Sequence, residues 1–168
     1  MYQEFNYIIL DYFRTLRKKD GVFDIAIPFL ISGLSYCVPL LLNKNTSATN
    51  VEGSIITLLS VLIGFSLAVF TVFTTTNNPN IEKLKKEHTV FIVDGIKVTL
   101  FHNLLTGIVY PFIIEIALLI TNLLYIASPC KAESLYLPIN IFFISHLLFV
   151  TLRSITNLYF VLTAPNKK

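Results

Sequence analysis

Charged side chains are scarce in this sequence. Only 14% of the 168 residues are Asp, Glu, Lys or Arg, whereas soluble domains contain roughly 25%. Hydrophobic residues reach 54%, and the mean hydropathy is +0.70. So few charges cannot cover the surface that a soluble domain of this size exposes to water. The composition therefore excludes a cytosolic enzyme, a disordered tail and a freestanding nucleic-acid domain, and it predicts that much of the surface faces a lipid bilayer.

Cysteine is also scarce, with Cys37 and Cys130 alone. Two such distant cysteines indicate neither a disulfide framework nor a metal site. The histidines at 88, 102 and 146 stand apart from one another, without the ligand spacing of zinc sites. The chain lacks a Walker loop, a GxGxxG turn, a nucleophile elbow and an HExxH motif. We therefore expect no metal, no cofactor and no enzymatic activity.

Four long apolar stretches are present. A helix needs about 20 apolar residues to cross roughly 30 Å of hydrocarbon. The alternating ten-residue segments of a membrane β-barrel are missing. We therefore expect an all-α integral membrane protein with four transmembrane helices, in a transmembrane domain over 22–162. The four spans are expected at about 22–42, 54–73, 106–126 and 137–162.

The N-terminal segment 1–21 contains no apolar run long enough for a cleavable signal, so we expect it to be retained. Its apolar residues recur at helical spacing, which predicts an amphipathic helix lying along the cytoplasmic face of the membrane. These residues are Ile8, Ile9, Tyr12, Phe13 and Leu16.

The 74–105 connection contains a second helix signal. Asn78-Pro79 is typical of an N-cap followed by proline at the first helical position. Beyond it, Ile81, Leu84, Phe91 and Ile96 share a loosely apolar side. We expect a short cytoplasmic helix there, before the third span.

The distribution of positive charge predicts the orientation. Ten of the 13 Lys and Arg residues lie in 1–21, 74–105 and 163–168, whereas Lys44 and Lys131 lie alone in the other two connections. Positive residues resist translocation across the membrane. Both termini, the connection 74–105 and the tail 163–168 are therefore expected in the cytoplasm.

Two ionisable residues lie well inside the expected spans. Glu115 and Arg153 each lie nine residues from the inner end of a span, about 13 Å deep at helical rise. They can form a buried pair between the third and fourth helices or between protomers. Such a pair is either a gate, proton site or ion-path lining, or a structural pair in which Arg153 extends towards the inner surface. Asp24, near the inner boundary, is a rival partner for Arg153.

Small and hydroxyl residues mark one side of the second span. This spacing lets helix backbones approach closely in lipid. It indicates packing within the subunit, a contact between subunits, or a hydroxyl-lined pore wall. The residues are Thr57, Ser60, Gly64, Ala68 and Thr71.

A basic surface is expected on the cytoplasmic side. It would bind either an acidic face of a partner protein or anionic lipid. Its residues are Arg14, Arg17, Lys18, Lys19, Lys83, Lys85 and Lys86.

Residues 54–70, Ser-Ile-Ile-Thr-Leu-Leu-Ser-Val-Leu-Ile-Gly-Phe-Ser-Leu-Ala-Val-Phe, and the later run Ile81-Glu-Lys-Leu-Lys-Lys-Glu resemble small four-span membrane subunits of bacterial phage-defence systems, of the Kiwa type. The resemblance covers about thirty residues, together with the size and the number of spans. It implies a homo-oligomeric sensor in the inner membrane, coupled to a cytoplasmic, nucleic-acid-interacting partner. It implies no catalytic residue.

These observations favour a non-enzymatic, homo-oligomeric inner-membrane subunit that senses for, or anchors, a cytoplasmic effector protein in antiviral defence. The subunit would contact membrane lipid and the effector, with no direct contact to nucleic acid. The alternative is a small ion-conducting pore that depolarises the membrane. A membrane-embedded enzyme or transporter is disfavoured, because the spans contain few polar residues.

Overall fold

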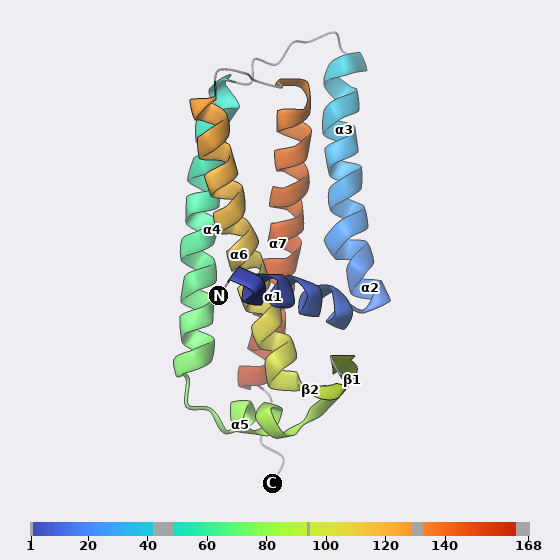
Figure 1. Ribbon diagram of the computed structural model, residues 1–168, viewed down its shortest axis with the longest axis vertical. Helices are drawn as coiled ribbons and strands as arrows, with labels where there is room; N and C mark the ends of the chain where they lie inside the picture. The colour runs from blue at the N-terminus through green and yellow to red at the C-terminus, as the bar shows by residue number, and fades with distance from the viewer. Residues whose placement is uncertain (1, 42–48, 94, 129–132, 164–168) are drawn as a thin grey trace. The chain divides into compact units, whose positions relative to one another are not determined.

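The computed structural model describes residues 2–41, 49–93, 95–128 and 133–163 (Figure 1). Within these ranges, helices account for most residues and one short β-hairpin for the rest of the regular structure. The loop residues Lys44 and Lys131, and the expected tail beyond Thr163, lie outside the described residues.

The elements follow the expected order along the chain. They are α1 (Tyr2–Thr15), α2 (Lys18–Gly21), the π-helix η1 (Val22–Ala26), α3 (Ile27–Leu41), α4 (Thr49–Thr75), α5 (Pro79–Lys86), β1 (His88–Val93), β2 (Ile96–Thr99), α6 (Leu100–Ala127) and α7 (Glu133–Thr163).

Four segments of the described chain are long and apolar enough to cross a membrane. By length and composition these segments are Lys19–Cys37, Val51–Thr75, Leu100–Ala127 and Leu135–Thr163. The expectation of four membrane-length helices is therefore confirmed. The helices α4 and α6 are longer than the expected spans, because α6 begins six residues before 106 and α4 begins five residues before 54, whereas the first segment, Lys19–Cys37, is shorter than the expected 22–42.

The connection between α4 and α6 differs from the sequence-based expectation. The helix signal is confirmed, since the Asn78 side chain accepts a hydrogen bond from the backbone N–H of Asn80 at 2.8 Å and α5 begins at Pro79. However, Phe91 and Ile96 belong to an antiparallel hairpin instead of a helix face. The all-α expectation is therefore wrong for residues 88–99.

Local sequence features explain why β1 and β2 form a hairpin. The run from His88 to Val93 contains β-branched and aromatic residues, which favour strands. The reversal includes Gly95 at φ 83°, a conformation that glycine adopts without steric cost. The pairing of His88 with Thr99 then delivers the chain directly to the first residue of α6.

The described chain divides into two compact units. The first unit comprises Met1–Arg17, Phe65–Ile113 and Val150–Lys168, and the second comprises Lys18–Gly64 and Ile114–Phe149. The helices α4, α6 and α7 contribute residues to both units.

Each unit has an apolar core. In the second unit, buried residues of α4, α6 and α7 pack together around Leu59 and Leu147, which are inaccessible to solvent. In the first unit, Phe73 of α4 packs with residues of α6 and α7, and its ring stacks on Phe101 at 5.0 Å between centroids.

One close helix contact in the first unit lies at a glycine. Ser154 Oγ on α7 donates a hydrogen bond to the Gly107 carbonyl on α6 at 2.8 Å. A Cβ atom at position 107 would lie 3.4 Å from Ser154 Oγ, at the limit of ordinary van der Waals contact. Small residues at such contacts are typical of helices that associate in lipid.

Candidate functional site

Ionisable side chains are buried in the second unit. Glu115 on α6 and Asp24 on η1 have exposed fractions of 0% and 1%, and His146 on α7 is also buried. All three lie within segments that are long and apolar enough to span a membrane. Ionisable groups at such positions are costly, and they commonly mark functional sites.

A proline explains why His146 contacts the π-helix. In a regular α-helix the Asp24 carbonyl would accept a hydrogen bond from the N–H of residue 28, but Pro28 has no N–H. The chain forms a π-turn at Val22–Ala26, and His146 Nδ1 makes a short hydrogen bond to the Asp24 carbonyl. Because a carbonyl oxygen only accepts, this contact places a proton on Nδ1. The histidine therefore fixes the start of the first membrane-length segment to α7.

Two asparagines join α6 and α7 in the second unit. Asn122 Nδ2 donates hydrogen bonds to Asn140 Oδ1 and to the Leu118 carbonyl, both at 2.8 Å. The Tyr136 hydroxyl donates to Asn122 Oδ1 at 2.6 Å, and its ring stacks on Tyr125 at 4.0 Å between centroids. Hydrogen-bonded amides of this kind hold apolar helices together in lipid. Sequence reasoning missed this network, although polar residues at 122 and 140 inside apolar stretches were a visible signal.

In the first unit, α1 is attached to α6 and α7 through Tyr12. Tyr12 is 2% exposed, and its ring stacks on the Tyr110 ring at 3.8 Å between centroids and 4° between planes. The Arg153 guanidinium lies 5.5 Å from the Tyr12 ring centroid, and its Nη2 donates a hydrogen bond to the Tyr12 hydroxyl at 3.2 Å. Cation–π contacts with desolvated rings contribute about 2 kcal/mol. The N-terminal helix is therefore docked on the protein through its most buried aromatic residue.

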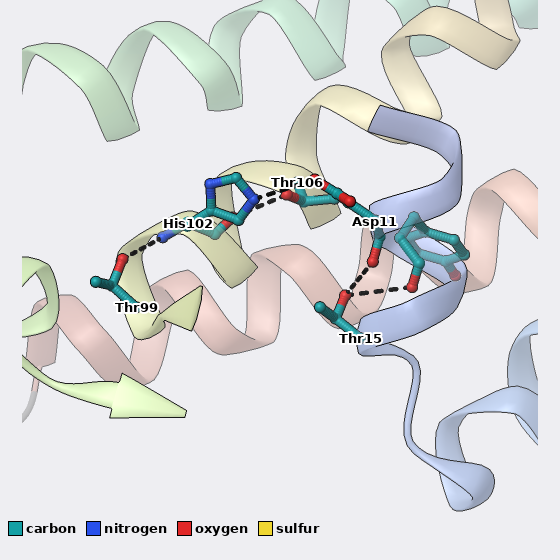
Figure 2. A network of polar contacts seen from close by, with 6 residues as sticks. Asp11, Thr15, Thr99, His102 and Thr106 are labelled. Atoms are coloured by element: carbon teal, nitrogen blue, oxygen red, sulfur yellow. Dashed lines mark hydrogen bonds and ion pairs between the residues drawn. The ribbon is translucent and has the colours of Figure 1, made fainter. Parts of the chain in front are cut away.

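A second contact joins α1 to the start of α6 (Figure 2). His102 Nε2 lies 3.4 Å from Asp11 Oδ2, an ion pair when the imidazole is protonated. The His102 N–H donates to Thr99 Oγ1, which caps the start of α6, and Thr106 Oγ1 donates to the His102 carbonyl. Thr15 Oγ1 donates to the Asp11 carbonyl at 2.7 Å and closes the last turn of α1. Since the His102 side chain is half exposed, this ion pair stabilises the docking only weakly.

The two charges that the sequence suggested as a pair belong to different units. Glu115 lies in the second unit, and Arg153 lies in the first, where it contacts Tyr12. The Glu115–Arg153 pair stays a prediction, as does the rival pairing with Asp24.

The small and hydroxyl face of α4 is exposed in the protomer. Thr57, Ser60, Gly64, Ala68 and Thr71 are all exposed, and a Cβ atom at position 64 would meet no atom within 4 Å. The three hydroxyls donate to the carbonyls four residues earlier at 2.8–2.9 Å. Because these hydroxyl groups already donate to backbone carbonyls, the face can contact lipid or another protomer without leaving an unsatisfied hydrogen-bond donor. None of these five residues is buried against another helix among the described residues.

The basic residues are divided between α1–α2 and α5. Arg14, Arg17 and Lys19 are exposed, as are Lys83, Lys85 and Lys86; the Lys18 side chain lies outside the described residues. On α5, Lys85 Nζ lies 2.6 Å from Glu82 Oε1. The hydrogen bond and positive charge of Lys85 hold the pKa of Glu82 below its usual value. Among the described residues no group of three or more His, Cys, Asp or Glu is placed to hold a metal ion.

Comparison of the chain with protein-family models, with curated proteins and with solved structures gives no match. Its function is therefore argued from its own residues.

A mutant cycle tests whether Glu115 and Arg153 interact. If they do, Arg153→Gln alone should leave Glu115 as an uncompensated buried charge, which costs about 3 to 5 kcal/mol in soluble interiors. Glu115→Gln alone should cost less, because Arg153 is only partly buried. The double variant should therefore assemble better than either single variant, as measured by expression and oligomer mass. Tyr12→Phe is the control, because it removes the hydroxyl that Arg153 contacts and keeps both charges. Additive losses in the double variant would show that the two residues do not interact.

Proposed function

We propose that this chain is a non-enzymatic, multi-pass subunit of the bacterial inner membrane that assembles as a homo-oligomer and senses for, or anchors, a cytoplasmic effector protein. The resemblance to phage-defence subunits makes antiviral defence the proposed setting. The observation that carries the proposal is the exposed apolar surface of the hairpin between the second and third membrane-length segments. Val90 is 88% exposed, and Ile92 and Ile96 are also exposed.

The hairpin requires a partner on physical grounds. A two-stranded hairpin is marginally stable alone in water. This one contacts α1 and α5 and buries Val98, yet the aliphatic side chains of Val90, Ile92 and Ile96 remain exposed. Exposed apolar patches rimmed by polar residues are typical of interaction sites. The neighbouring exposed Lys83, Lys86 and Lys97 supply a positive rim, so a partner with an apolar centre and an acidic rim fits best.

Self-association is supported by α4. Its small and hydroxyl face is exposed, uncharged and internally hydrogen-bonded, which suits close contact with a second copy of the helix in lipid. The open space around Gly64 leaves room for such an approach.

Removal of the exposed aliphatic groups tests the effector contact. Val90→Ser combined with Ile92→Ser should release the soluble protein that the unchanged chain retains in a pull-down from native cells, because these two exposed residues share one face of β1 and form the apolar centre of the contact. High salt should weaken the same association, since the rim is charged. Tyr7→Ser is the matched control, as Tyr7 is an exposed aromatic residue on α1 outside the hairpin. Undiminished retention of every soluble partner by the hairpin variant would contradict the proposal.

Two exposed glycines allow a matched test of self-association. Gly64→Leu should reduce the oligomer mass in detergent, because the new side chain blocks close approach at the α4 face. Gly33→Leu on α3 is the control, since position 33 is equally open and lies off that face. Equal masses for both variants would show that the α4 face contacts lipid.

The alternative function is an ion-conducting pore. It is favoured by the buried Asp24, Glu115 and His146 in membrane-length segments, because such groups line ion and proton paths. Ion flux through vesicles that contain the purified chain separates the two functions. A subunit that only anchors an effector gives no flux.

A further inference from the structure

We propose that α1 rests on the inner surface of an anionic bilayer at the level of Tyr110 and Arg153. The segments 100–109 of α6 and 154–163 of α7 then stand outside the hydrocarbon, on the cytoplasmic side. The inference rests on the membrane insertion in the proposed function, and it adds where the membrane ends and what covers the free face of α1.

The attachment of α1 to α6 and α7 determines the height along these helices at which the membrane surface would lie. Tyr12 stacks on Tyr110 and contacts Arg153, so the axis of α1 cannot slide along α6 or α7 without breaking both contacts. Figure 1 shows α1 lying across α6 and α7 in the first unit, as a helix in the plane of a membrane surface would. Tyr110 is ten residues from the start of α6, and Arg153 is ten residues from the end of α7.

The free face of α1 has the chemistry of a membrane-surface helix. Phe5, Leu10 and Phe13 are exposed, and the Phe13 ring also contacts the rings of Tyr12 and Tyr110, so Phe13 lies at the edge of the face that is buried against the protein. The exposed cations Arg14, Arg17 and Lys19 follow directly. Exposed apolar residues beside a cluster of positive charge bind an anionic lipid surface, because the apolar groups enter the headgroup boundary and the cations meet the phosphates.

The helix lengths agree with this level. The 28 residues of α6 and the 31 of α7 would measure about 42 and 46 Å at helical rise, whereas the hydrocarbon is about 30 Å thick. From Tyr110 to Ala127 the rise is about 26 Å, and from Glu133 to Arg153 it is about 30 Å. The helix length that exceeds the hydrocarbon thickness is therefore residues 100–109 of α6 and 154–163 of α7, which lie on the same side of α1.

The composition of segments 100–109 and 154–163 is mixed. Their polar residues are His102, Asn103, Thr106, Ser154, Thr156, Asn157 and Thr163, and beside them Tyr159 and Phe160 are exposed apolar residues. On this placement Arg153 lies in the headgroup layer.

Cysteine labelling tests the level directly. Single cysteines are placed at Phe160, Val61 and Leu10 after Cys37→Ser and Cys130→Ser, in the full chain reconstituted into vesicles of phosphatidylethanolamine and phosphatidylglycerol. A membrane-impermeant maleimide is supplied on both sides of the membrane. Phe160 and Val61 are each 64% exposed in the protein. A difference in labelling between their cysteines would therefore report whether water or lipid surrounds each position.

Phe160→Cys should react at least about tenfold faster than Val61→Cys, because a thiolate forms readily in water and not in hydrocarbon. Leu10→Cys should react as slowly as Val61→Cys, since α1 presents position 10 to the bilayer. Slow labelling at Phe160, equal to that at Val61, would overturn the inference and place the end of α7 in lipid. Fast labelling at Leu10 would overturn it as well, by showing that the face is open to water. Fast labelling at Val61 would refute membrane insertion itself, and the proposed function with it.

Discussion

Hydrogen bonds of polar groups inside apolar helices are the constraint on which the rest of this structure depends. Hydrocarbon offers no partner, so each polar group must find one within the protein. Pro28 leaves the Asp24 carbonyl without its helical donor, and His146 supplies the missing hydrogen bond. Asn122 donates a hydrogen bond to Asn140 between α6 and α7, and Tyr136 pairs with the other amide atom of each asparagine. These contacts hold the membrane-length segments of the second unit in register.

The same constraint shapes the first unit, where an N-terminal helix is built into the protein. The stacking of Tyr12 on Tyr110 and its contact with Arg153 make α1 a fixed part of this unit. The start of α6 follows the hairpin directly, and Asn80 of α5 donates a hydrogen bond to the Val161 carbonyl near the end of α7 at 3.0 Å. Helix α1, helix α5 and the hairpin are therefore parts of the same unit.

The membrane-length segments could be predicted from sequence because 20 consecutive apolar residues have few alternatives. The cap at Asn78-Pro79 was predictable because its signal is local. The hairpin was missed because Phe91 and Ile96 fit a loose helical side as well as a strand, and pairing across Gly95 decides between them. The contact of Arg153 with Tyr12 joins residues 141 positions apart, and no local pattern predicts such a contact.

The proposed function requires this chain to cross the inner membrane four times with both ends in the cytoplasm. Reporter fusions at residue 168 and within the first outer connection at residue 48 test it most directly. A reporter that is active only in the cytoplasm should be active at residue 168 and inactive at residue 48. Activity at both positions, or at neither, would contradict the four-span topology and the orientation that the Lys and Arg distribution predicts.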